Sequence, residues 1–399
     1  MRPRSPIAAV GVAALAVVGW VSVAPGSAGA AGAPAAPARH AAHVCAQSPG
    51  HAACAAIRLD GATPATMATA AASAAAVAGL GPADLQSAYK LPAGGAGQTI
   101  AIVDAFDDPN AESDLATYRS NFGLPACTTA NLCFRKVNQN GGTAPPPSDV
   151  GWAEEISLDI DMVSAVCPAC HILLVEATSN SFANLGAAVN RAAAMGANAI
   201  SNSYGGSDAR DTTNGAFYNH PGIAVTASSG DGGFAVEYPA SSQFVVAVGG
   251  TSLTRNTSAR GWGETAWSGA GSGCSRFNTA IPAASTFNTG CSRRAVADVS
   301  AVADPNTGVA VFDTFGGVGG WLVFGGTSVS SPIIASVFGL AGNSGSIDAN
   351  DFPYQHATGN LFDVTSGSNG RCSPTQLCTA RTGWDGPTGL GTPNGIGAF

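Results

Sequence analysis

The residue best suited to act as a nucleophile is Ser328, which directly precedes an apolar helix predicted over residues 329–341. It follows Gly325, Gly326 and Thr327, and the two glycines allow the sharp backbone turn that such a junction needs. A serine at a helix start meets unpaired N–H groups and the positive end of the helix dipole, which suit a nucleophile whose attack creates an oxyanion. The alternative interpretation is an ordinary serine that caps the helix.

A nucleophilic serine needs a base, and the histidines of this chain are poorly placed to provide one. Three of the six lie in the N-terminal segment, and none lies in an HGTH-like helix of the type that carries the base of a Ser-His-Asp site. A subtilisin-type site built on Asp104 and Ser328 is the alternative, and it requires a histidine base. The histidines are His40, His43, His51, His171, His220 and His356.

Two carboxylates are better placed than any histidine. Glu155 and Asp159 are four residues apart in a helix predicted over residues 152–166, so they lie on the same face of that helix. Like charges at this spacing repel each other, and an internal pair would therefore indicate a functional role. The alternative is a solvated acidic stripe that also contains Glu154 and Asp161.

A further acid, Asp231, lies in the sequence Ser-Gly-Asp-Gly-Gly, directly after a strand predicted over residues 222–227. Catalytic groups gather at the carboxyl ends of the strands in α/β sheets, which makes this a candidate position. The alternative is a turn aspartate, since Asp-Gly is a favoured turn pair.

The elements that must position these residues are apolar strands that alternate with helices. This pattern predicts an α/β fold with a mainly parallel sheet that is flanked by helices on both faces. Strands are expected over 99–103, 171–175, 199–203, 222–227 and 244–248, and helices over 152–166, 182–195 and 329–341.

The N-terminus is predicted to be an export signal, because a basic start and a long apolar run precede a small-residue cleavage site. We expect residues 1–30 to be a signal peptide and residues 31–80 to be a short pro-segment or disordered lead. Residues 81–399 are then the folded domain of a secreted, extracellular protein. A membrane anchor is the alternative for the first segment, because its apolar run approaches spanning length.

The cysteines agree with export. An even number of cysteines in an exported chain predicts disulfides, and local pairing is the simplest connectivity. One couple forms a Cys-x-x-Cys motif, but no second half-site at zinc spacing accompanies it. The couples are Cys45 and Cys54, Cys127 and Cys133, Cys167 and Cys170, Cys274 and Cys291, and Cys372 and Cys378.

The charge composition argues against two classes of partner. The chain has 17 Lys and Arg residues against 25 Asp and Glu residues, which gives a net charge of −8. Because the few basic residues form no cluster, a nucleic-acid or anionic membrane surface is not expected.

Together these motifs resemble one family, the sedolisins or serine-carboxyl peptidases. The resemblance runs from about residue 80 to the C-terminus, with the motifs in the family's order. It implies a subtilisin-like three-layer fold and a serine-type endopeptidase that hydrolyses peptide bonds at acidic pH. The motifs are Glu155-x-x-x-Asp159, SGDGG around Asp231, YPASSQFVVAVGGT over 238–251, and GGTSVSSP around Ser328.

The resemblance also implies the role of each residue. Ser328 is expected to be the nucleophile and Glu155 its general base, while Asp159 holds and tunes Glu155. Asp231 is expected to stabilise the oxyanion, which a carboxyl group can do only when it is protonated. Clustered, buried carboxyls raise one another's pKa values, so one can stay protonated while another acts as the base. By the same resemblance, Asp104 joins this network.

The C-terminal segment resembles the calcium site of the family. Asp363 and Val364 correspond to one ligand cluster, and Gly383 and Asp385 correspond to the other. Calcium takes carboxylate and backbone carbonyl oxygens, so this set suits Ca2+. One departure from the family is Arg381, which stands where a glycine is usual and whose charge opposes cation binding. The alternative is a turn-rich segment without a metal.

The segment Ser203-Tyr204-Gly205-Gly206 resembles the edge strand that pairs with an extended substrate. Another departure from the family is the lead, because residues 31–80 are too few for the folded prodomain that sedolisins usually carry. We expect a monomeric peptidase that acts on polypeptides. The alternative is a secreted binding protein on the same fold with a weak or inactive site, but all four catalytic positions are filled, which favours the enzyme.

Overall fold

The computed structural model describes residues 39–62 and 77–399. The predicted signal peptide, residues 1–30, lies outside the described residues, so that expectation stays a prediction. Contacts between residues unite Ala38–Phe399 in one unit. Residues 39–62 therefore belong to the same unit as residues 81–399.

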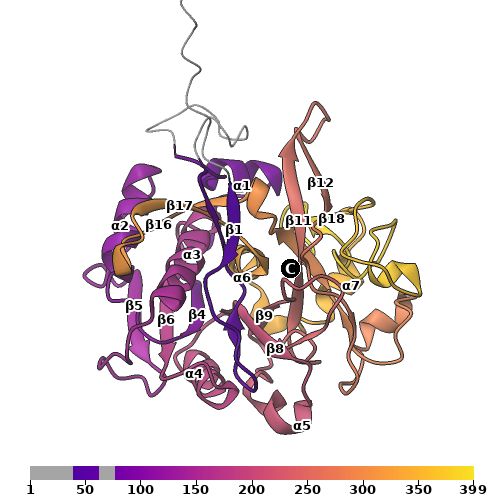
Figure 1. Ribbon diagram of the computed structural model, residues 1–399, viewed down its shortest axis with the longest axis horizontal. Helices are drawn as coiled ribbons and strands as arrows, with labels where there is room; N and C mark the ends of the chain where they lie inside the picture. The colour runs from indigo at the N-terminus through magenta and orange to yellow at the C-terminus, as the bar shows by residue number, and fades with distance from the viewer. Residues whose placement is uncertain (1–38, 63–76) are drawn as a thin grey trace, which may run out of the picture. The chain divides into compact units, whose positions relative to one another are not determined.

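A central sheet of eight strands organises this unit (Figure 1). The strand order is β12-β11-β9-β7-β4-β6-β5, and β15 pairs with β11 beside this path. All neighbours are parallel except β12, which runs antiparallel to β11, so the predicted mainly parallel sheet is confirmed. The strands are β4 Thr99–Ala105, β5 Phe134–Asn138, β6 His171–Ala177, β7 Ala199–Asn202, β9 Ala224–Ser228, β11 Val246–Arg255, β12 Trp262–Ala266 and β15 Val299–Val302.

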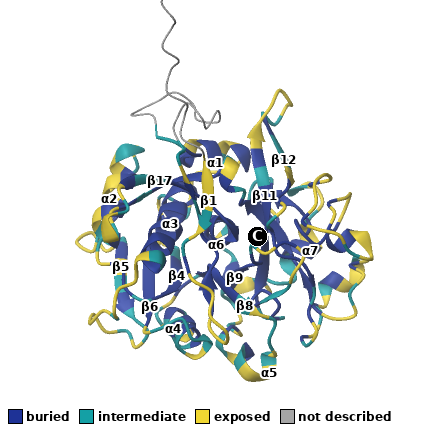
Figure 2. Cartoon of the chain, in the orientation of Figure 1, coloured by how far each residue is buried: buried dark blue, intermediate teal, exposed yellow. Residues whose placement is uncertain are grey.

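Helices flank the sheet, which confirms the expected α/β architecture. The two long apolar helices α3 and α6 pack against each other, α6 also packs on β7, β9 and β15, and α4 packs on β4 and β6. Figure 2 shows α3, α6 and the central strands almost entirely in the colour of buried residues. The helices are α1 Pro82–Ala88, α2 Ala111–Asn121, α3 Val150–Val166, α4 Phe182–Ala194, α5 Asp211–Asn214, α6 Thr327–Ala341 and α7 Phe352–His356.

The segment before residue 80 differs most from the sequence-based expectation. Residues 39–62, called the N-terminal strap below, contain three strands and run through the middle of the view in Figure 1. β1 pairs with β3, β3 pairs with β17, and β2 pairs with β8. A disordered lead therefore does not describe these residues, because their backbone groups are paired with the folded domain, and the alternative of a short pro-segment stays a prediction. The strands are β1 His40–His43, β2 Ala53–Cys54, β3 Ile57–Asp60, β8 Tyr204–Ser207 and β17 Gly320–Gly325.

All ten cysteines form disulfides, in the five local pairs that the sequence predicts. The paired residues are only 3 to 17 positions apart, so each disulfide closes one loop and joins no distant segments. The remaining strands form small sheets at the periphery. They are β10 Glu237–Tyr238, β13 Gly273–Cys274, β14 Ala295–Val296, β16 Val309–Asp313, β18 Leu361–Phe362 and β19 Thr392–Pro393.

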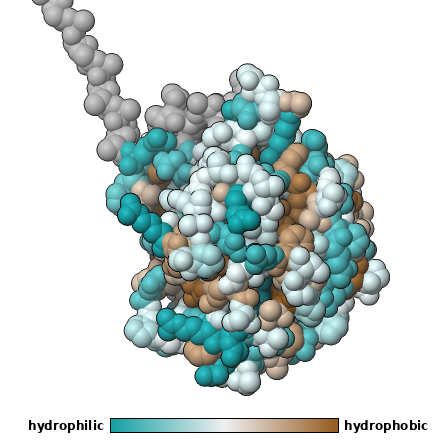
Figure 3. All heavy atoms as spheres, turned by 90° about the vertical axis from the view of Figure 1, so that its right-hand side faces the viewer, coloured by the Kyte–Doolittle hydropathy of each residue, from teal (hydrophilic) through white to brown (hydrophobic). Residues whose placement is uncertain are grey.

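Most apolar side chains are packed inside, in one large cluster of buried residues from the sheet and the helices. On the face drawn in Figure 3, apolar residues form separate patches between polar ones. Within residues 39–62 and 77–399, no helix combines the length and the apolar character needed to cross a membrane. The large apolar side chains that remain exposed in these ranges are Leu132, Val150 and Phe234.

Candidate active site

Ser328 is the second residue of α6 and is fully buried. Gly326, directly before this helix, has a φ of 92°, which glycine adopts readily, so the chain turns sharply from β17 into α6. The Ser328 hydroxyl donates a hydrogen bond of 2.8 Å to Oε2 of Glu155 and lies 3.1 Å from the carbonyl oxygen of Ser203. The structure thus brings the predicted nucleophile and the predicted base together.

Glu155 lies on α3, whose first turn is capped by the side chain of Asp149. Every residue from 152 to 166 is buried, Glu154 and Asp161 included. The alternative of a solvated acidic stripe is therefore wrong. Carboxylates this far from water are costly unless they are hydrogen-bonded, paired or protonated, which makes the helix unsuited to a purely structural role.

Asp159 lies one turn after Glu155 and is also fully buried. Both of its carboxylate oxygens lie 2.8 Å from the hydroxyl of Ser203. From the sequence, Ser203 is expected only as part of a substrate-binding edge, and no local pattern indicates its contact with Asp159. The residue instead touches the site twice, with its hydroxyl on Asp159 and its carbonyl oxygen on Ser328.

Asp104, on β4, is a third buried acid of this cluster. Within the described residues neither of its carboxylate oxygens has a hydrogen-bond partner, and burial raises its pKa to about 8. Burial raises the pKa of Glu155 well above its usual value, and the charges of Asp159 and Asp104 raise it further. The pKa of Asp159 is raised by burial and by Asp104, and lowered by the Ser203 hydroxyl. The ionisation of each of these three carboxyls therefore depends on the charge of the others.

Asp231 lies in the loop that follows β9 and contacts Thr327, the residue directly before Ser328. Its Oδ1 accepts hydrogen bonds of 2.8 Å from both the backbone N–H and the hydroxyl of Thr327. Its Oδ2 is buried and has no partner among the described residues. Burial raises the pKa of Asp231 to about 8, so below neutral pH Oδ2 carries a proton that it can donate.

No histidine enters this arrangement in the part of the chain that the structure describes. The Ser328 hydroxyl bonds to a carboxylate and to a backbone carbonyl. Ring nitrogens of His51, His220 and His356 bond instead to backbone carbonyl oxygens close to them in sequence. The geometry therefore does not support the histidine-based alternative.

β8, the segment expected to pair with an extended substrate, directly follows Ser203 and lies between β10 and β2 in a three-stranded sheet. A pocket of about 830 Å³ lies beside it and is lined by β8, by the loop of Asp231 and by the N-terminal strap. Glu237 also lines this pocket, and burial raises its pKa to about 7. The edge itself is occupied, because β2 of the strap pairs with it.

The residues of the expected calcium site lie in neighbouring loops. Oδ2 of Asp363 accepts the N–H of Gly383 at 2.9 Å, and Oδ2 of Asp385 accepts the N–H of Arg381 at 3.0 Å. Val364 is buried beside Asp363. Burial raises the pKa of Asp385 to about 7, and the charge of Asp363 contributes. A cation between the two carboxylates would relieve this repulsion.

Arg381 does not fill the space between the two aspartates, and no further acidic side chain joins them in the described residues. The guanidinium group of Arg381 bonds to Gln376 at 2.9 Å and forms no ion pair with either aspartate. Across the described ranges no cluster of three or more His, Cys, Asp or Glu side chains suits a metal ion. A calcium ion here would depend on backbone carbonyl oxygens, so calcium binding stays a prediction.

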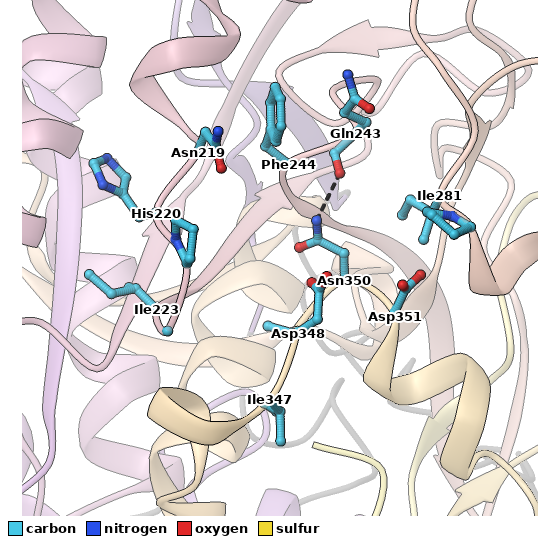
Figure 4. A pocket seen from close by; sticks show the side chains of 14 residues that line it. Asn219, His220, Ile223, Gln243, Phe244, Ile281, Ile347, Asp348, Asn350 and Asp351 are labelled. Atoms are coloured by element: carbon cyan, nitrogen blue, oxygen red, sulfur yellow. Dashed lines mark hydrogen bonds between the residues drawn. The ribbon is translucent and has the colours of Figure 1, made fainter.

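A second pocket, of about 310 Å³, lies away from these residues (Figure 4). It is lined by segments 219–223, 243–244, 281–282 and 347–351 and contains none of the acids discussed above. Its walls are tied together by a 2.7 Å hydrogen bond from Asn350 to the carbonyl oxygen of Gln243. The pocket is lined by His220, Asp348 and Asp351, but no serine, threonine or cysteine lines it that could act as a nucleophile beside them.

Comparisons with known proteins agree with this geometry. The model of the subtilase family matches residues 138–347, just over half of the chain. Kumamolisin of Bacillus sp. (strain MN-32) is 30% identical over 356 residues, which cover 79% of this chain and 62% of kumamolisin. Sedolisin of Pseudomonas sp. (strain 101) is 30% identical over 40% of this chain and 29% of that protein. The chain thus spans less than two thirds of the length of these relatives.

A solved structure supports the fold. Pseudomonas sedolisin, described as a serine-carboxyl proteinase complexed with two molecules of pseudo-iodotyrostatin, matches with a TM-score of 0.67 and 24% identity. The match covers 80% of this chain and 96% of that chain. The family model shows that the chain belongs to the subtilase family, its similarity to kumamolisin and sedolisin supports membership of the sedolisin group, and the solved structure shows the subtilisin-like fold.

Proposed function

We propose that this protein is a serine-carboxyl endopeptidase that hydrolyses peptide bonds at acidic pH. The observation that carries the proposal is the 2.8 Å hydrogen bond from the Ser328 hydroxyl to Glu155, inside a buried cluster of carboxyls. A hydroxyl at a helix start, bonded to a carboxylate, has both an acceptor for its proton and donors for the oxyanion that its attack creates.

In this mechanism Glu155 is the general base. Oγ of Ser328 attacks the carbonyl carbon of the substrate while its proton passes to Oε2 of Glu155, which then gives the proton to the leaving amine. Water hydrolyses the acyl ester by the same route in reverse. Asp159 and Asp104 share protons with Glu155, so the cluster can hold a single negative charge next to the serine.

Asp231 is the oxyanion partner. Two hydrogen bonds from Thr327 fix the orientation of its carboxyl group through Oδ1. Oδ2 has no partner among the described residues and is left to interact with the substrate. The proton on Oδ2 and the N–H groups at the start of α6 are the donors that a tetrahedral intermediate needs. When Asp231 loses this proton, its charge repels the oxyanion, so the activity is confined to pH values below about 8.

The substrate is a polypeptide in extended conformation. An extended chain that pairs with β8 in place of β2 sets its backbone N–H and C=O groups against those of Tyr204 and Gly205, which is the usual mode of strand addition. Five disulfides and the predicted signal peptide support secretion, because disulfides persist in oxidising compartments.

The test is hydrolysis of a denatured protein at about pH 4 and at about pH 7 by the wild type and by Ser328→Ala. We expect turnover at the acidic pH that the substitution abolishes. Ser336→Ala is the matched control, since this serine lies in the same helix, is equally buried and has no side-chain partner among the described residues. Equal turnover by wild type and Ser328→Ala would contradict the proposal and favour a binding protein on the same fold.

A further inference from the structure

The second pocket lies at the opposite end of the sheet from the Ser328 site. Segments 219–223 and 243–244, which line it, lead into β9 and β11, so it lies at the amino ends of these strands. Asp231 instead follows the carboxyl end of β9. Because β9 has 5 residues and a strand rises about 3.3 Å per residue, about 17 Å separate its two ends. The pocket is therefore distinct from the site described above.

Two carboxyl groups line this pocket without a cationic partner. Figure 4 shows those of Asp348 and Asp351 turned toward the loop that carries Gln243. Oδ1 of Asp351 accepts the backbone N–H of Ala283 at 2.9 Å, which fixes this carboxyl group and leaves Oδ2 for another donor. Among the ion pairs of the described residues, none includes Asp348 or Asp351.

No other lining group offsets these two charges. Among the described residues that line the pocket there is neither lysine nor arginine. Nε2 of His220 lies 3.0 Å from the carbonyl oxygen of Phe217, and burial lowers the pKa of this histidine, so its ring is uncharged at pH 7. Burial raises the pKa of Asp351, and the charges of Asp348 and Asp298 raise it further. A bound cation would relieve this repulsion, whereas a bound anion would increase it.

The rest of the wall suits a hydrocarbon chain. Ile223, Phe244, Ile281 and Ile347 line the pocket beside the two carboxyl groups. An acidic end and an apolar wall together match a ligand that carries a cation on an aliphatic stem. A metal ion fits less well, because Ca2+ takes about six to eight oxygen ligands. No group of three acidic, histidine or cysteine side chains in residues 39–62 and 77–399 suits a metal.

Hydrogen bonds hold the walls of the pocket in place. The side-chain amide of Asn350 donates to the carbonyl oxygen of Gln243 at 2.7 Å, and the N–H of Gln243 donates to Asp211 at 3.1 Å. The loop of Asp348 and Asp351 is thus tied to the segment that leads into β11. The volume of about 310 Å³ is at the lower end of the range for small-ligand sites, about 300 to 1,000 Å³. The pocket therefore has room for a single side chain or a small molecule.

We propose that this pocket binds a guanidinium group on an aliphatic stem. The planar guanidinium carries five N–H donors, so it can bond to Oδ2 of Asp351 and to the carboxylate of Asp348 at once. An ammonium group has the same charge but lacks this planar fork. The guanidinium belongs either to an arginine residue of a polypeptide or to a free small molecule, and the experiment distinguishes the two. Because binding needs no reaction at Ser328, this inference is independent of the proposed peptidase function.

The experiment is isothermal titration calorimetry at pH 7 with the full-length S328A chain, which lacks the nucleophile and leaves its probes intact. The peptide probes are acetyl-Gly-X-Gly-amide with arginine, citrulline or lysine as X, and agmatine is the free probe. Citrulline keeps the shape of arginine but removes its charge. We expect the arginine peptide to bind at least about tenfold more tightly than the citrulline peptide, with the lysine peptide between them.

Substitutions in the pocket provide the second part of the test. D348N and D351N should each weaken the binding of the arginine peptide at least about tenfold, because each removes a charged acceptor. D351N retains a side-chain oxygen for the bond from Ala283, and thermal unfolding of each variant confirms that it folds. E112Q is the matched control, because Glu112 lies on α2 and does not line the pocket.

The source of the guanidinium follows from the tighter probe. Tighter binding of the arginine peptide than of agmatine identifies a polypeptide ligand, and the reverse identifies a free small molecule; both results support the inference. Absence of saturable binding of either probe up to about 10 mM would overturn it. So would equal affinity for the arginine and citrulline peptides, tighter binding of lysine than of arginine, or unchanged affinity in both D348N and D351N.

Discussion

The Ser203 hydroxyl lies 2.8 Å from both carboxylate oxygens of Asp159, although 44 residues separate them in sequence. A hydroxyl that bonds to the charged form of a carboxyl favours that form, and this contact lowers the pKa of Asp159. Ser203 thereby helps the acid cluster to keep the negative charge that a base next to Ser328 needs.

We expect Ser203→Ala to lower kcat by about tenfold and to move the acidic limb of the pH–rate profile to higher pH. The reason is that loss of the donor raises the pKa at which the cluster first ionises. The profile should be compared with that of Ser201→Ala, whose hydroxyl bonds to Ser331 instead. A lower rate with an unmoved acidic limb would mean that Ser203 acts only through packing.

Glu155→Gln should lower kcat by about 10²- to 10⁴-fold, because the amide cannot accept the proton of Ser328. KM should change little, since Glu155 is buried beneath the bound chain. Steady-state kinetics on a peptide substrate provide the measurement, with Glu237→Gln as a control carboxyl in the adjacent pocket. Near-normal kcat in Glu155→Gln would remove it as the base.

Asp231→Ala should lower kcat by about 10²- to 10³-fold, as expected when one donor to an oxyanion is lost. Asp231→Asn is a sharper probe. Its amide oxygen can keep the two bonds from Thr327 while its NH₂ group takes the place of Oδ2 as a donor that does not titrate. The activity of this variant should therefore persist above pH 8, where the wild type loses it; an alkaline limb identical to that of the wild type would contradict the role of Asp231.

Much of this site was predictable from the sequence, because each of its four main residues has a recognisable local pattern. The glycines before Ser328, the helical spacing of Glu155 and Asp159, and the strand before Asp231 are local signals, and the structure brings all four residues together. Long-range partners leave no such signal. The hydroxyls of Ser203 and Thr327 contact Asp159 and Asp231 only because the fold brings distant segments of the chain together.

The N-terminal strap was mispredicted for a different reason. Its composition suggests a loosely ordered lead, yet Ile57 and Leu59 are buried and alternate with Arg58 and Asp60 in the pattern of a half-buried strand. Four residues are too few to distinguish such a strand from a loop by pattern alone. The Cys45 and Cys54 couple was the better signal, because a disulfide loop needs an ordered surface against which to pack.

The protein should be more stable in acid than at mildly alkaline pH. Asp104 and Asp231 have pKa values of about 8 in the folded state against 3.8 ordinarily, so the folded state binds more protons than the unfolded state between these values. Stability therefore falls as pH rises from about 4 to about 8. Glu176, Asp108 and Asp385 act in the same direction.

Thermal unfolding of Ser328→Ala, which avoids self-digestion, should show a Tm at least about 5 °C lower at pH 8 than at pH 4. Adding Asp104→Asn should flatten this dependence, because the amide does not titrate. A Tm that rises with pH over this range would show that burial does not raise the pKa values of these carboxyls in the folded protein.

If calcium binds between the loops of Asp363 and Asp385, calcium should raise Tm relative to EGTA by several degrees. Ligand at about 100 times its Kd stabilises a folded protein by about 2.7 kcal/mol. Asp363→Asn should remove most of this response, and Asp348→Asn, at an exposed aspartate elsewhere, should preserve it. An identical Tm with calcium and with EGTA in the wild type would leave the segment as a metal-free loop.

The distance along the chain between Glu155 and Ser328, 173 residues, affects biosynthesis. Chains are made and fold from the N-terminus onward, so a nascent polypeptide holds the acids of α3 long before it holds a hydroxyl to activate. The strap precedes both. The strands β2 and β3 of the strap are therefore synthesised before α3 and α6, whose side chains form the site.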